Sequence, residues 1–93
     1  MSLNNGEIVG APCSIRPGPF PHERLIAVDA ESGPLVGFAD PGDLHSVDGE
    51  RGFLKGVVID MSTDPVAVWL FGSFFRTSGL AHVRRGLLTR LEA

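Results

Sequence analysis

The sequence predicts a small all-β domain built from five to six antiparallel strands. The central observation is the stretch Phe53 to Phe75, in which two apolar runs flank a polar break at residues 60–65, the pattern of a β-hairpin. Neither run repeats its apolar residues at a helical spacing. The 93 residues include 12 Gly and 7 Pro, a content that favours many turns between short strands.

The second of these runs, Val66 to Phe71, is apolar on both sides. Side chains alternate along a strand, so Val66, Val68 and Leu70 face one way while Ala67, Trp69 and Phe71 face the other. Such a strand lies inside a closed barrel or sandwich, or leaves one face for a partner.

The start of the chain is expected to be loose. Residues 1–12 have few side chains typical of a hydrophobic core, so we place a flexible segment there and a single domain over residues 13–93. A short first strand covers Cys13 to Arg16. The prolines that follow, at positions 17, 19 and 21, exclude a central strand and suggest a connector carrying Phe20 into the core, or alternatively a proline-rich ligand segment.

The middle of the chain contains a second predicted hairpin. Arg24 to Asp29 and Pro34 to Asp40 face each other across a turn in which Gly33 can take a positive φ angle. Another turn follows at residues 40–43. Residues 44–52 are then interpreted as a polar loop that leads into the central hairpin.

The last stretch, Leu80 to Leu91, fits two structures. Its leucines match an amphipathic helix by spacing, which would give an α+β fold with a C-terminal helix at 78–91. However, Arg84 would fall among the leucines, and Gly86 would cost a helix interior about 1 kcal/mol. We therefore favour a strand over 81–85, a tight turn, and a strand over 88–91.

This layout of strands resembles the SH3-like small barrels over most of residues 13–91. It also resembles small uncharacterised bacterial proteins in which a similar start, here Gly18 to Arg24 (GPFPHER), leads into such a barrel. SH3 modules bind proline-rich peptides through clustered aromatic residues and an acidic loop. This chain has no Tyr, so that activity does not follow from the resemblance.

The composition limits the classes of function. One cysteine, Cys13, allows no internal disulfide, and no apolar run approaches the roughly 20 residues that span a bilayer, so a cytoplasmic protein without a membrane partner is expected. Residues 1–75 carry ten acidic and four basic side chains, whereas residues 76–93 carry four arginines and one acid. This asymmetry is either a solvated surface or a basic edge for an acidic partner. The pI near 5.4 argues against nucleic acid.

No catalytic or cofactor signature stands out. Cys13 has no surrounding motif and is interpreted as a core residue. The best metal candidate is the acidic loop that contains Asp43, His45 and Asp48, but it lacks the pattern of a calcium loop and is interpreted as solvated. Phosphate-binding glycine motifs are also missing. We expect no enzyme activity, no cofactor and no metal.

What remains is a set of aromatic residues with arginines beside it. These candidate interface residues are Trp69, Phe71, Phe74, Phe75, Arg76, Arg84 and Arg85. They are either all core or in part a contact site, since Trp, Phe and Arg are enriched in interface cores. The main hypothesis is a non-enzymatic module that self-associates or binds a protein through this face. The alternatives are a nucleic-acid or small-anion binder using the arginines with Arg90, and a metal enzyme using the acidic loop.

Overall fold

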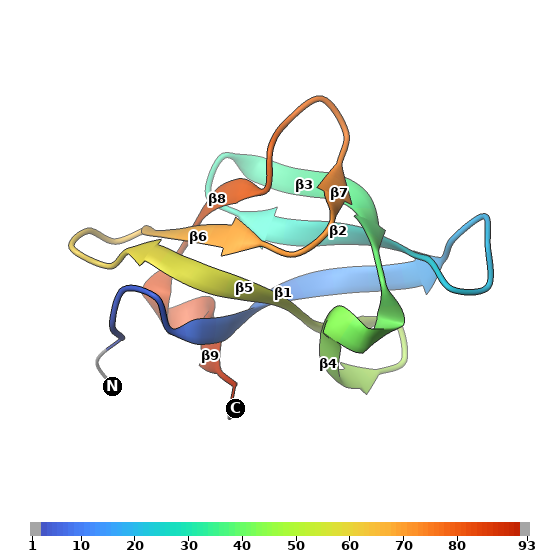
Figure 1. Cartoon of the computed structure of the whole chain (residues 1–93), viewed down its shortest axis with the longest axis horizontal. Coiled ribbons are helices and arrows are strands. Elements are labelled where there is room, and N and C mark those ends of the chain that lie inside the picture. Colours follow the sequence, from blue (N-terminus) through green and yellow to red (C-terminus); the bar gives the residue numbers. More distant parts are fainter. Residues whose placement is uncertain (1–2, 92–93) are drawn as a thin grey trace.

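The computed structural model describes residues 3–91, and these form one antiparallel sheet of nine strands (Figure 1). The predicted all-β class is confirmed, although the strands outnumber the five to six expected. The strands are β1 (Ile8–Pro17), β2 (Arg24–Ala30), β3 (Gly33–Ala39), β4 (Leu44–Asp48), β5 (Arg51–Asp60), β6 (Val66–Leu70), β7 (Ser73–Phe74), β8 (Leu80–Val83) and β9 (Thr89–Arg90).

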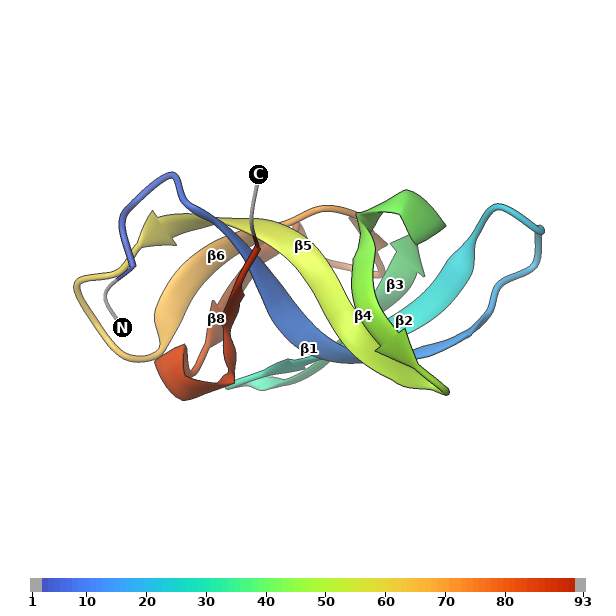
Figure 2. The ribbon, with the colours of Figure 1, turned by 90° about the horizontal axis from the view of Figure 1, so that it is seen from below.

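The strands are ordered β7-β3-β2-β1-β5-β6-β8, with β4 added to β5 and β9 added to β1. The sheet curls into a half-barrel, which is visible when the molecule is seen from below (Figure 2). At the far end of the order, β8 returns to the β2–β3 turn, where the Glu31 N–H donates to the carbonyl of His82 at 2.8 Å. The Arg84 guanidinium bridges the same seam by pairing with the Glu31 carboxylate.

Strand β1 lies at the centre of the sheet and begins earlier than expected. It pairs with β2, β5 and β9, and its inward side chains Val9, Ala11 and Cys13 are fully buried. The expectation of a loose segment over residues 1–12 is therefore wrong for residues 8–12, and Leu3 is buried as well. The sequence did not indicate this strand because several of its residues are small. Gly10 is small because the strands pack closely there: an added Cβ would lie 2.8 Å from Phe53 Cβ. Residues 1, 2, 92 and 93 lie outside the described part.

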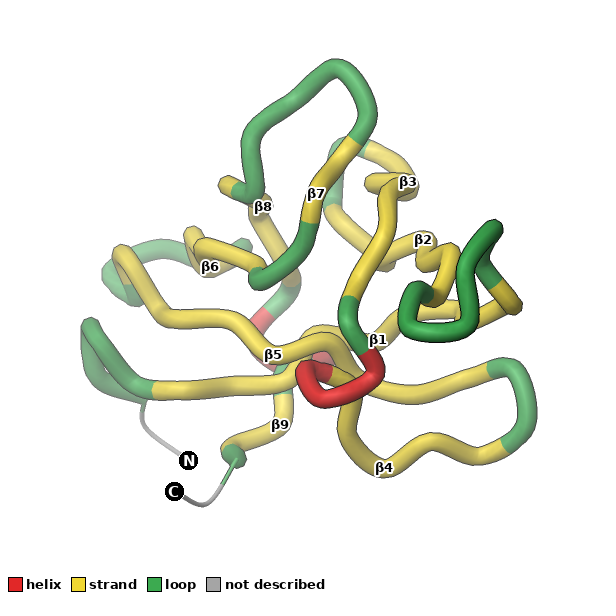
Figure 3. The backbone as a smooth tube through the Cα atoms, turned by 45° about the vertical axis from the view of Figure 1, so that its right-hand side comes forward, coloured by secondary structure: helices red, strands yellow, loops and turns green. Residues whose placement is uncertain are grey.

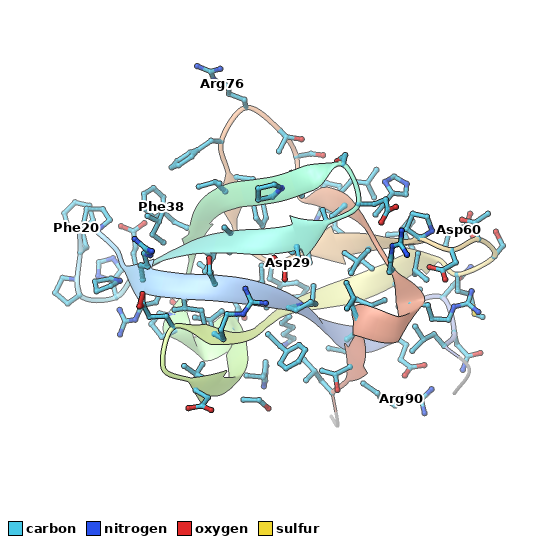
Figure 4. The ribbon with its side chains drawn as sticks, turned by 180° about the vertical axis from the view of Figure 1, so that it is seen from behind. Phe20, Asp29, Phe38, Asp60, Arg76 and Arg90 are labelled. Atoms are coloured by element: carbon cyan, nitrogen blue, oxygen red, sulfur yellow. The ribbon has the colours of Figure 1, made fainter. Side chains whose placement is uncertain are left out.

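The proline-rich segment forms the loop between β1 and β2, at one end of the molecule (Figure 4). Phe20 is 57% exposed and stacks on the ring of His22 with 6.0 Å between centroids. The Arg24 guanidinium donates to the carbonyls of Pro21 and Glu23 and so holds the loop closed. The expectation that this connector carries Phe20 into the core is wrong.

Both predicted hairpins are present. Strands β2 and β3 pair in register across a turn in which Gly33 has a φ of 115°, and β5 pairs with β6 as the central hairpin. The polar loop expected at 44–52 is instead a further hairpin, in which β4 and β5 turn around Gly49 (φ 61°). Its alternation was obscured because β4 lies at an edge and most of its side chains are exposed.

The last stretch consists of strands, as favoured, and the alternative helix at 78–91 is wrong. Strand β8 pairs with β6, a short 3-10 turn covers Arg85–Leu87, and β9 pairs with β1 (Figure 3). Gly86, Arg84 and Arg85 therefore lie outside the strands, whereas a continuous helix would have placed the arginines among the leucines. Within residues 3–91 there is no helix with the length and apolar content to cross a membrane.

Candidate interaction surface

Strand β6 follows the predicted alternation and separates its apolar residues onto two faces. Val66, Val68 and Leu70 point into the half-barrel and are at most 1% exposed, whereas Trp69 points outward and is 47% exposed. The register of the neighbouring strands extends this outer face, because directly paired residues share a face of a sheet. Trp69 pairs with Val57 of β5 and with Leu80 of β8, and Val57 pairs with Ile8 of β1.

These four residues, Ile8, Val57, Trp69 and Leu80, form one line across four adjacent strands, which we name the Trp69 row. Leu80 is 41% exposed, while Ile8 and Val57 are half-buried. Ile59, two residues beyond Val57 on β5, adds a further side chain that is 49% exposed. Three large apolar side chains are thus exposed side by side on one face, whereas single exposed apolar residues scattered over a surface would need no explanation.

The two ends of this face along β5 carry opposite charges. At one end the Lys55 ammonium lies 5.0 Å from the centroid of the Phe71 ring, a cation–π contact that holds it beside the row. At the other end is Asp60, which the alternation of side chains would point inward. A register shift between Val58 and Asp60 pairs Asp60 with the outward residue Ala67 instead, so the carboxylate joins the outer face.

The other two aromatic residues of the predicted set lie elsewhere. Gly72, with a φ of 151°, turns the chain after β6, and β7 crosses to pair with β3. Phe74 is half-buried against the core. Phe75 packs edge-on against Phe38 at 5.3 Å, and its N–H donates to the Val36 carbonyl. The structure therefore divides the four aromatic residues between two surfaces.

The arginines of the predicted set are separated too. Arg76, with a φ of 61°, stands at the tip of the loop between β7 and β8, on the opposite side of the molecule from Arg90 (Figure 4). Arg90 pairs with Glu7, and Arg84 pairs with Glu31 at 2.9 Å. Arg85 is half-buried, with its backbone N–H donating to Asp64 and its guanidinium to the Met61 carbonyl. Acids from the first part of the chain thus neutralise much of the basic end.

These ion pairs change the acidity of the carboxylates. The hydrogen bond from Arg84 lowers the pKa of Glu31 below its ordinary value, and the hydrogen bond from Arg90 lowers the pKa of Glu7 in the same way. The pKa of Asp60 is lowered by hydrogen bonding from Ser62 in the turn that follows β5. All three carboxylates are thereby held in the charged form.

The residues considered for catalysis or metal binding are not brought together. Among residues 3–91 no three His, Cys, Asp or Glu side chains are grouped so that they could hold a metal ion, so the site hypothesised at Asp43, His45 and Asp48 has no structural basis. Cys13 is a free, fully buried thiol on the inner face of β1. Burial raises its pKa to about 11, which keeps it protonated and weakly nucleophilic.

The sequence analysis identified Trp69 and Phe71 but missed the remaining members of the outer face. The alternation along β5 and β8 could have indicated Val57, Ile59 and Leu80, because each is adjacent in sequence to an inward apolar residue, Val58 or Ala81. No sequence signal indicated that Asp60 points outward, since a bulge is set by how two strands pair.

No family model matches the chain, and no curated protein and no solved structure is significantly similar to it. The resemblance to SH3-like barrels therefore stays a prediction made from the layout of the strands. Fold and surface together define a small all-β protein with one contiguous apolar face on the outside of its sheet.

Proposed function

We propose that this chain is a non-enzymatic protein-interaction module and that the Trp69 row is its contact surface. The observation that carries the proposal is the exposure of Trp69, Leu80 and Ile59 side by side on one face of the sheet. With roughly 150 to 250 Å² for an aromatic side chain, Trp69 alone leaves on the order of 100 Å² open to solvent. Covering this surface with another protein would release water from it.

The composition of the surface also supports a protein contact. Trp is the residue type most enriched among interface hot spots, and it works best when surrounded by residues that exclude water. Trp69 has such neighbours in Val57 and Leu80, with Lys55 and Asp60 as a charged rim. A central apolar cluster with a polar rim is the usual anatomy of a protein interface.

The arginine alternative has no comparable observation in its favour. Arg84 and Arg90 each pair with a glutamate of the same chain, and Arg76 stands apart from both. A nucleic-acid surface would need these cations together and available to phosphates. The single buried thiol of Cys13 fits a reducing compartment, so we place the module in the cytoplasm.

Photo-crosslinking tests the proposal in the cells that make the protein. A benzophenone amino acid is introduced in place of Trp69, where it reaches only molecules that contact the row. The matched control carries the same group in place of Val36, which is also exposed on an outer strand face but lies outside the row. Purified adducts are identified by mass spectrometry.

We expect protein adducts at position 69 in clear excess over position 36, with the crosslink mapped to the partner peptide. Equal yields at the two positions, or no protein adduct at position 69, would mean that the row is an ordinary exposed surface. The wild-type protein offers a second readout through Trp69, its single tryptophan. Acrylamide quenching of its emission should fall when the row is covered.

A further inference from the structure

We propose that the partner of the Trp69 row is a second copy of this chain, bound in a symmetric dimer whose two-fold axis runs along the row. This inference rests on the proposed function and names the partner for that surface. In such a dimer two copies of the outer face pack against each other, and each residue of the row lies opposite its own counterpart.

Charged side chains lie on β5 on either side of the row. Lys55 lies two residues before Val57, and Asp60 lies three residues after it, beyond the bulge. At about 3.3 Å per strand residue, the two charges stand at comparable distances of roughly 7 to 10 Å on either side of the row. The face is therefore apolar in the middle, positive at one end and negative at the other.

A two-fold axis along the row makes this arrangement of charges self-complementary. A two-fold axis along the row sets the two β5 strands antiparallel, so that Lys55 of each copy faces Asp60 of the other. An axis parallel to β5 would instead place Lys55 against Lys55 and Asp60 against Asp60, which is repulsive. Of the two in-plane symmetries, the charges select the one along the row.

Both charged groups are held in place before association. Lys55 is fixed over the Phe71 ring, and the Asp60 carboxylate accepts a hydrogen bond from the Ser62 N–H at 2.9 Å. Hydrogen bonding from the Ser62 side chain and from its N–H lowers the pKa of Asp60. Groups that are already ordered lose less conformational freedom on binding, so their attraction counts more fully.

The test compares dimerisation of the wild type with two charge variants by analytical ultracentrifugation over a range of concentrations. Lys55→Glu places a carboxylate against Asp60 of the second copy, at two symmetric positions. We expect the dissociation constant of the dimer to rise about 30-fold. The double variant K55E/D60K restores opposite charges and should recover most of the loss, which a merely structural effect of either substitution would not do.

A cysteine variant locates the axis. Leu80→Cys places a thiol on the row, where the two copies should lie about 10 Å apart, the spacing of packed sheets, and so within reach of a short bismaleimide crosslinker. Val36→Cys serves as the matched control on an exposed strand position outside the row. The native Cys13 does not compete, because it is fully buried. We expect crosslinked dimers for L80C and none for V36C, with both variants folded by circular dichroism.

Three results would overturn the inference: a wild type that stays monomeric at millimolar concentration, a dimer that the double charge variant does not restore, or crosslinking through V36C and not L80C. The photo-crosslinking experiment keeps this failure distinct from failure of the proposed function. Adducts at position 69 that contain a different protein would leave the interaction module standing with another partner. Their absence would remove both proposals.

Discussion

The two faces of strand β6 are made of the same kinds of residue and meet opposite surroundings. Inward, Val66, Val68 and Leu70 are closed off from solvent by the sheet curling over them. On the outward side, Trp69 is 47% exposed although it is the largest apolar residue of the strand. Hydrophobic pattern alone therefore does not say which face builds the fold. The inner face does so here, and the outer face keeps apolar surface that the fold leaves unused.

The largest expected effect contrasts two leucines of neighbouring strands. Leu70 is 1% exposed on the inner face of β6, and Leu80 is 41% exposed on the outer face of β8. Leu70→Ala should lower the free energy of unfolding by about 2 to 5 kcal/mol because it leaves a cavity in the core. Leu80→Ala should lower the free energy of unfolding by less than about 1 kcal/mol, since this side chain is already partly in contact with solvent in the folded protein.

Urea unfolding measures both values, at protein concentrations low enough that further dilution leaves the midpoint unchanged. That condition separates stability of the single chain from association through the Trp69 row. Equal losses for the two leucines would contradict the division into inner and outer faces.

A smaller effect tests how tightly the inner face of β3 is filled. A Cβ added at Gly37 would lie 2.2 Å from the Ser73 carbonyl oxygen and 2.8 Å from Phe74 Cα, so the backbone of β7 would have to move. We expect Gly37→Ala to destabilise the fold by about 1 to 3 kcal/mol. Gly86→Ala is the matched control, because nothing lies within 4 Å of its added Cβ. Thermal unfolding of both variants measures the effect, and equal losses for the two would contradict the close packing of β7 against β3.

The smallest effect concerns the contribution of surface ion pairs to the dependence of stability on pH. The pKa of Glu31 is lower in the folded protein than its ordinary value of 4.5, because Arg84 binds the carboxylate. A carboxylate with a lowered folded pKa adds stability above its unfolded pKa, and that stability is lost as the pH falls through the folded pKa. We expect unfolding free energy to decline below about pH 5, and less steeply in Glu31→Gln.

Urea unfolding at a series of pH values between 7 and 3 measures this slope. Glu50→Gln makes the same change of charge at the longer contact with Arg16, 3.7 Å, and serves as the control. An identical acid slope in E31Q and the wild type would show that the seam between β8 and the β2–β3 turn gains nothing from the ion pair.

Sequence reasoning succeeded where a local signal decides the structure. The two hairpins follow from alternating apolar runs joined by turn residues, and the final strands follow from Gly86 and Arg84, which a helix accommodates poorly. Predictions from the sequence failed where the structure depends on which strands pair with each other. Strand β7 has only two registered pairs, with Gly37 and Phe38, and it forms because the chain after Gly72 reaches the edge of β3.

The candidate surface divides in the same way. The outward direction of Trp69 follows from alternation, and so could that of Leu80. The separation of Phe74 and Phe75 from Trp69 follows from the turn at Gly72, which removes them from the strand that four closely spaced aromatic residues suggested. The bulge that turns Asp60 outward depends on how β5 meets β6, and no single strand encodes it.

The central position of β1 has a consequence for how fast the chain folds. Its partners are β2, which follows it directly, then β5, and finally β9, where Val9 lies opposite Arg90. Contacts of such sequence separation place all-β folds among the slower folders, typically in milliseconds to seconds. The backbone of Val9 and Gly10 is paired on one side by β9, so satisfying these groups requires the first and last described strands to meet.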